Sequence, residues 1–166
     1  MSADVVTLDR FEKREQVQTQ DEIQLSFEFC QNEKNNKLTI VVMETVHGLD
    51  FCNLVSDLVP KIILDMRLSV RFDLPGSSRD HIFNQFKRSR ALYSRASLNW
   101  HDLTHSDFML GENSLSNRLN HELLEREESP LMILVQKPSH AQLLHSFVNR
   151  QLKGNGKENW SVGHCA

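Results

Sequence analysis

The sequence contains few cysteines, and Cys30, Cys52 and Cys165 are an odd number with none within four residues of another. This spacing offers neither a disulfide framework nor the CxxC pair of a zinc knuckle, so we expect reduced thiols. No apolar stretch approaches the roughly 18 residues of a membrane span, which excludes a transmembrane helix. The first residues lack the apolar core of a secretory signal, so we expect a cytoplasmic protein.

Catalytic and cofactor motifs are also scarce. The chain has neither a GxxxxGK[ST] loop nor a GxGxxG loop, so nucleotide binding has no support. Cys52, His47 and Asp50 could form a thiol, base and carboxylate, but a free cysteine is more often a small buried hydrophobe. His101 and His105 have the spacing of helical metal ligands but lack the HExxH glutamate. We therefore expect no enzyme, no bound metal and no cofactor.

The composition fits one globular domain, because 39% of the 166 residues are hydrophobic and 25% are charged. The net charge of −3 and the pI near 6.2 argue against nucleic-acid binding by the whole chain. The charge is unevenly distributed. Residues 71–100 carry six basic residues against two acidic ones, so an acidic partner could bind there.

The pattern along the chain predicts a flexible leader over residues 1–20 and a domain over residues 21–166. Apolar residues alternate with polar ones from Ile23 to Phe29, which predicts a half-buried strand. A second alternating run covers residues 38–46. The Asn-rich loop between these runs suggests two antiparallel strands.

The remainder of the chain suggests more short strands. Residues 49–67 fit either a short helix broken by Pro60 or a buried strand after it. Residues 86–95 suit an exposed strand with a basic face, and residues 131–136 suit a strand buried on both faces. Together with runs at 68–74 and 160–165, this pattern predicts an all-β fold, an antiparallel Greek-key β-sandwich with short helical segments in long loops.

Several of these segments resemble a synaptotagmin-type C2 domain. IQLSFEF and KLTIVVMETVHGL are similar to the first two strands of that family, and VRFDLPG is similar to the third. RASLNW resembles the stretch after the basic fourth strand, while a clear final strand is missing. The resemblance implies a C2-like sandwich over residues 21–166 that acts in membrane trafficking and exocytosis.

The calcium site of that family is degenerate here. C2 domains bind Ca²⁺ through about five loop carboxylates, because this hard cation needs several oxygen ligands. The second calcium-binding loop reads QKPSHAQ and contains no acid. Asp50, Asp57 and Asp65 stand as vestigial candidates in the first loop, so we expect calcium-independent binding and no metal site.

The predicted binding surface is the basic strand. The resemblance implies that Lys87, Arg88, Arg90 and Arg95 bind anionic phospholipid headgroups or acidic trafficking proteins, at the periphery of a membrane. Arg71, on a neighbouring strand, is expected to join them. The alternative is a protein-protein interaction scaffold without a lipid role, in which the loops at 49–67 and 111–130 carry the partner site. The open sheet edge left by the missing strand also allows a homodimer.

Overall fold

The structure of the protein is a computed structural model that describes residues 36–103, 107, 117, 119–126 and 128–165. The compact unit to which these residues belong spans Asn35–Ala166. The predicted leader and the predicted strand at residues 23–29 lie outside the described residues. Within the described part of the chain, no helix is both long and apolar enough to cross a membrane.

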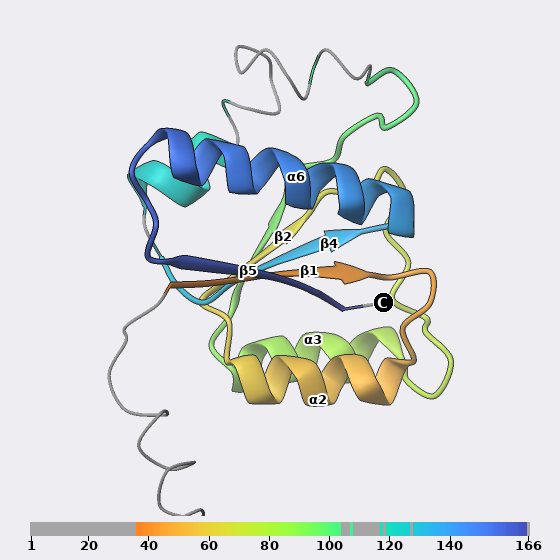
Figure 1. Ribbon diagram of the computed structural model, residues 1–166. Helices are drawn as coiled ribbons and strands as arrows, with labels where there is room; N and C mark the ends of the chain where they lie inside the picture. The colour runs from red at the N-terminus through yellow and green to blue at the C-terminus, as the bar shows by residue number, and fades with distance from the viewer. Residues whose placement is uncertain (1–35, 104–106, 108–116, 118, 127, 166) are drawn as a thin grey trace, which may run out of the picture. The chain divides into compact units, whose positions relative to one another are not determined.

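Strands and helices alternate along the compact unit, which is the pattern of an α/β fold. Among the described residues, three α-helices and one π-helical turn, η2, separate the strands (Figure 1). The elements in chain order are β1 (Asn36–Val42), α2 (Gly48–Leu58), β2 (Ile62–Asp65), α3 (Arg79–Arg88), β3 (Leu92–Arg95), η2 (His121–Glu125), β4 (Leu131–Val135), α6 (Pro138–Gly154) and β5 (Trp160–Cys165).

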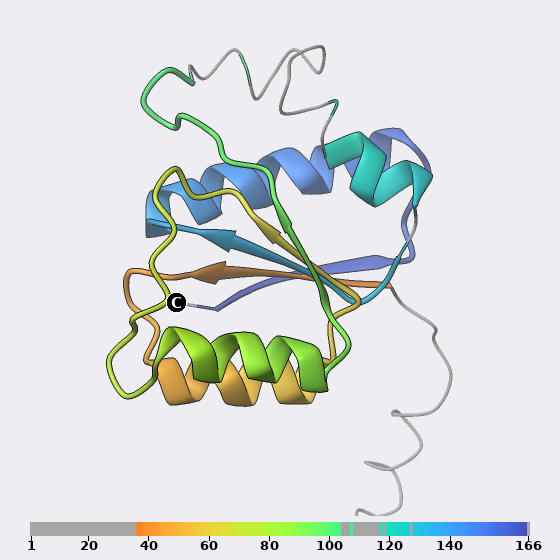
Figure 2. The same cartoon turned by 180° about the vertical axis from the view of Figure 1, so that it is seen from behind.

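The five strands form one sheet in the order β3-β2-β4-β1-β5, and every neighbouring pair is parallel. The arrowheads of β1 and β4 accordingly point toward the same end of the sheet, from the front and from behind (Figure 1, Figure 2). The predicted antiparallel all-β sandwich is therefore wrong. Parallel neighbours need a crossover between them, and the helices provide it.

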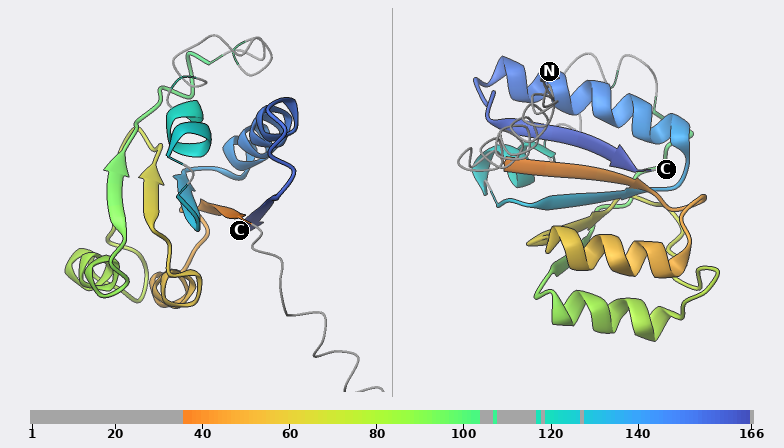
Figure 3. Two further views of the ribbon diagram at one scale, coloured as in Figure 1. Left: turned by 90° about the vertical axis from the view of Figure 1, so that its left-hand side faces the viewer. Right: turned by 60° about the horizontal axis from the view of Figure 1, so that its bottom comes forward.

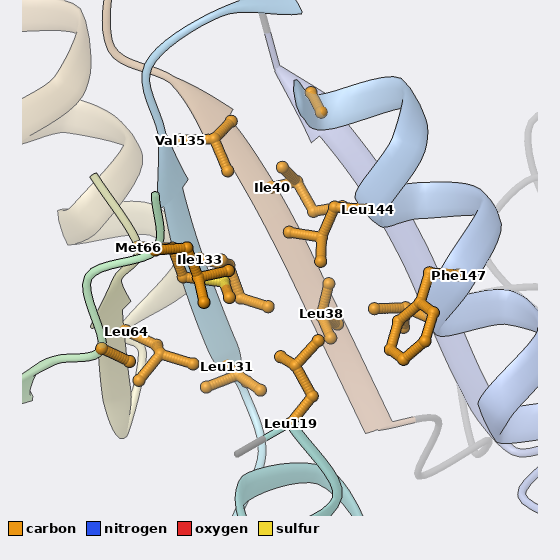
Figure 4. Packing of buried hydrophobic residues seen from close by; sticks show 14 of the residues in the cluster. Leu38, Ile40, Leu64, Met66, Leu119, Leu131, Ile133, Val135, Leu144 and Phe147 are labelled. Atoms are coloured by element: carbon orange, nitrogen blue, oxygen red, sulfur yellow. The ribbon is translucent and has the colours of Figure 1, made fainter. Parts of the chain in front are cut away.

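Helices cover both faces of the sheet (Figure 3). On one face, α6 packs over alternate residues of the central strands, including Leu38, Ile133 and Val135 (Figure 4). On the other face, α2 and α3 pack over the intervening residues, including Val41 and Met132. A strand between two such layers is buried on both sides, and all five residues of β4 are buried.

Local sequence signals explain where the helices begin. The imidazole of His47 accepts a hydrogen bond from the Leu49 amide at the start of α2, and Ser78 Oγ accepts one from the His81 amide in α3. Pro138 occupies the first turn of α6, where a missing amide hydrogen costs nothing. One face of α6 is apolar at helical spacing and is buried against the sheet: Ala141, Leu144, Phe147, Val148 and Leu152.

Two further predicted strands differ in the structure, since the one at 86–95 is shortened and the one at 68–74 is a loop. Residues 86–95 are divided between the end of α3, a turn at Ser89–Ala91 and the short strand β3. The alternating residues 68–74 form part of the loop between β2 and α3, where the Arg67 side chain donates a hydrogen bond to the Arg71 carbonyl. The ambiguous segment 49–67 contains both of its alternatives, since a helix precedes Pro60 and a buried strand follows it.

Candidate ligand-binding site

Among the described residues, a cavity of about 420 Å³ lies at the carboxyl ends of the strands. In open parallel sheets, ligands bind outside this edge, where the loops after neighbouring strands diverge. We call it the carboxyl-edge pocket. Its lining comes from the segments that follow β1, β2, β3 and β4: Met43, Arg67, Leu68, Ser69, Arg71, Leu74, Trp100, His101, Gln136, Lys137 and His140.

Arg67, which lines the pocket, belongs to a buried ion pair. Arg67 Nη2 lies 2.7 Å from Asp65 Oδ2, and Arg67 Nε donates to Asp65 Oδ1 at 2.9 Å. The two side chains are only 2% and 0% exposed. This two-point contact holds the guanidinium in one orientation. Its third nitrogen, Nη1, donates to the Arg71 carbonyl at 3.0 Å and so fixes the loop that follows β2.

Tyr93 on β3 completes the network from the neighbouring strand. Its hydroxyl donates to Asp65 Oδ2 at 2.9 Å. Burial and the adjacent Asp65 carboxylate raise the pKa of Tyr93 well above its ordinary value, so the phenol stays protonated and acts as a donor. The Arg67 guanidinium also lies 4.7 Å from the centre of the Phe72 ring, a cation–π contact that favours its burial.

A stacked aromatic pair also lines the pocket. The rings of Trp100 and His140 are parallel, with centres 4.3 Å apart and planes 3° apart. Trp100 Nε1 donates to the Met66 carbonyl at 3.0 Å, which fixes the indole against the end of β2. The Nδ1 atom of His140 is buried and has no hydrogen-bond partner among the described residues. A bound molecule could supply that partner.

Arg71 and Lys137 bring positive charge to the pocket lining, while the neutral form of the His140 imidazole is favoured. Burial lowers the pKa of His140, and Lys137 and His101 lower it further against the opposing effect of Glu44. The amino terminus of α6 begins beside these residues and adds the positive end of a 17-residue helix dipole. The Lys137 side chain caps no amide there. This edge of the sheet is thus suited to negative charge.

The structure separates the residues of the predicted basic strand. Lys87 and Arg88 occupy the last turn of α3, where positive charge offsets the negative end of the helix dipole. Arg90 follows in the left-handed conformation that leads into β3. These three residues precede β3 and lie at its amino end, whereas Arg95 lies at its carboxyl end. Of the predicted basic residues, only Arg71 lines the carboxyl-edge pocket.

The three vestigial calcium candidates do not share a loop. Asp50 lies in the first turn of α2, Asp57 lies near the end of the same helix, and Asp65 is paired with Arg67. Residues 49–67 thus form a helix and a strand, where the C2 resemblance implied a calcium-binding loop. Among the described residues, no three His, Cys, Asp or Glu side chains are grouped as metal ligands.

The candidate catalytic residues have other surroundings. Cys52 is buried on α2, with its Sγ 4.0 Å from Ser77 Oγ, and burial raises the pKa of the thiol. A raised pKa keeps a thiol protonated and weakly nucleophilic. His47 serves as the cap of α2. His101 lines the carboxyl-edge pocket, while His105 lies outside the described residues.

The sequence interpretation missed Arg67, Trp100, Lys137 and His140. Two features of the sequence pointed to Lys137 and to Arg67. A polar residue and a proline that follow an apolar run, as Lys137 and Pro138 do, are typical of a helix that begins directly after a strand. Residues in such a connection lie at the carboxyl edge of a parallel sheet. Asp65 and Arg67, two positions apart after the apolar residues of β2, are oppositely charged residues that can pair when buried.

Comparison of the chain with known protein families, with curated proteins and with solved structures finds no match in any of the three.

Proposed function

We propose that this protein is a binding protein, not an enzyme, and that its ligand is a small organic anion held in the carboxyl-edge pocket. The observation that carries the proposal is the charge of the lining. Arg71 and Lys137 line the pocket, and no Asp or Glu is among the lining residues. Among the described residues, neither Arg71 nor Lys137 forms an ion pair.

Arg67 has a different role from these two cations. Its charge is already balanced by Asp65, and its side-chain nitrogens have partners in Asp65 and Arg71. We assign Arg67 to positioning the loop that carries Arg71. The ligand charge is then met by Arg71 and Lys137, which approach the pocket from the loops after β2 and β4.

The remainder of the lining favours an organic body on the anion. Met43, Leu68, Leu74 and Trp100 are apolar surfaces that gain from contact with a hydrocarbon or aromatic group. Inorganic phosphate would leave them in water. The size of about 420 Å³ lies in the range of small-molecule sites, which is roughly 300–1,000 Å³.

Binding without catalysis is supported by the state of the nucleophile candidates. The Cys52 thiol and the Tyr93 phenol both have raised pKa values and are therefore protonated near neutral pH. The acidic-partner function predicted for the basic residues stays a prediction. Lys87, Arg88 and Arg90 precede β3 at its amino end, whereas Arg95 lies at its carboxyl end and Arg71 lines the carboxyl-edge pocket.

The proposal is tested by calorimetric titration at low salt with benzoate, phenyl phosphate, inorganic phosphate and the neutral isostere benzamide. We expect the two organic anions to bind more tightly than either control probe. Arg71→Gln and Lys137→Gln should each lower the affinity for benzoate about tenfold, because each removes one charge-assisted hydrogen bond of about 1.5 kcal/mol.

Lys87→Gln is the matched control, since it removes one exposed lysine at the opposite edge of the sheet. It should leave benzoate affinity unchanged. Equal affinity for benzamide and benzoate would overturn the proposal. So would an equal loss in the Lys87 and Lys137 variants, because that result reflects net charge and not a site.

A further inference from the structure

We propose that the ligand carries a second anionic group, bound in a second hollow on the other side of residues 68–70. This inference rests on the proposed function and narrows it to small dianions. The second hollow, which we call the arginine hollow, is lined by Leu68, Ser69, Val70, Arg79, Phe83, Tyr93 and Arg95.

The two hollows share part of their walls. Leu68 and Ser69 line both the carboxyl-edge pocket and the arginine hollow, so this short segment separates them. Leu68 is 56% exposed, although it is a large apolar residue. A ligand that spans both hollows must cross this segment, and an apolar spacer would cover the exposed leucine.

The arginine hollow has the same charge character as the first pocket. Arg79 enters from the first turn of α3 and Arg95 from the end of β3, and no Asp or Glu is among the lining residues. Neither arginine forms an ion pair within the described part of the chain. Two guanidinium groups on the lining of one hollow favour an anionic ligand over a neutral one.

Both arginines keep donors for a ligand. Arg95 Nη2 donates to the Leu68 carbonyl at 2.9 Å, which leaves its other guanidinium N–H groups available. The Arg79 guanidinium carbon lies 5.6 Å from the centre of the Phe83 ring, a cation–π contact. The fork of either arginine fits a carboxylate or a phosphate.

The separating segment is held at both of its ends. Arg67 is bonded to Asp65 and to the Arg71 carbonyl, and Arg95 is bonded to the Leu68 carbonyl. These hydrogen bonds hold the loop after β2 against the ends of β2 and β3. A restrained loop fixes the distance between the two anion subsites before the ligand arrives. Binding should therefore select dianions by length.

The test is calorimetric titration with a series of linear α,ω-dicarboxylates, from succinate to sebacate, and with the monocarboxylate of each chain length. At one preferred length, we expect the dicarboxylate to bind about tenfold more tightly than the monocarboxylate of that length, because it makes one further charge-assisted contact. Shorter and longer members should show a smaller gain. Dicarboxylates that gain nothing at any length would overturn this inference.

Arg79→Gln separates the two subsites, and Arg88→Gln on the same helix is its matched control. Arg79→Gln should abolish the gain of the dicarboxylate and leave monocarboxylate affinity unchanged, whereas Arg88→Gln should change neither. If Arg79→Gln weakens both ligands equally, the second subsite is refuted. If monocarboxylates bind through Arg71 and Lys137 but dicarboxylates of every length bind no more tightly, only this inference fails. If no carboxylate binds, the proposed function fails as well.

Discussion

Neutralising Asp65 should destabilise the fold strongly, because the carboxylate is the only charge that balances the buried Arg67 guanidinium in the described residues. It accepts hydrogen bonds from four donors, namely the Arg67 amide, Arg67 Nε, Arg67 Nη2 and the Tyr93 hydroxyl. An asparagine at this position places an NH₂ group opposite one or more of these donors. Removing one partner of a buried ion pair costs about 3–5 kcal/mol.

The assay is urea unfolding followed by circular dichroism, with Asp57→Asn as the matched control on the exposed part of α2. The control should change the free energy of unfolding by less than about 0.5 kcal/mol. A double variant, Asp65→Asn with Arg67→Met, should lose at least about 2 kcal/mol less than the sum of its single variants, because it strands no charge. A loss below about 1 kcal/mol for Asp65→Asn, or additive single variants, would refute the reasoning.

Two further predictions concern a glycine turn and a histidine. Gly76 has a φ of +81°, and a Cβ there would meet the His47 ring, so Gly76→Ala should cost about 2–3 kcal/mol in urea unfolding. Gly156 has a φ of +68° in open space, so Gly156→Ala should cost only about 1–2 kcal/mol; equal losses would show that the clash with His47 is harmless. Burial lowers the pKa of His140, so the unfolded chain binds its proton more readily than the folded one. Stability should fall as the pH drops below about 6.5, the ordinary histidine value, and through the lowered folded pKa. His140→Gln should make that fall shallower, and unfolding curves of unchanged pH dependence would contradict this assignment.

The positions of several strands could be read from the sequence, but the direction of their pairing could not. The apolar run at 38–46 overlaps β1, and the runs at 131–136 and 160–165 contain β4 and β5. Alternation reports which face a side chain occupies, and it is the same in parallel and antiparallel sheets. The run that indicated a parallel sheet was 131–136. A strand buried on both faces needs a layer on each side, and helices supply such layers in parallel sheets.

The basic residues misled for a different reason. Lys87, Arg88 and Arg90 are close in sequence and suggest one charged face, but the chain turns from α3 into β3 between Ser89 and Ala91. Arg67 was missed, because opposite charges at positions 65 and 67 permit an ion pair but do not show that it is buried. Its partner Asp65 lies two positions away, and only the turn after β2 brings the two side chains together. The site could not be predicted because it gathers residues from four separate loops.

The strand order has a consequence for how the chain acquires its structure. In the sheet, Leu38 of β1 is aligned with Leu131 of β4 on one side and with Val162 of β5 on the other. Among the described residues, β1 therefore has no sheet neighbour until β4 has been synthesised. Contacts between such distant segments slow folding, since a long loop must close before any pairing rewards it. During synthesis the apolar residues of β1 remain without their sheet, which makes early protection from aggregation a requirement of this topology.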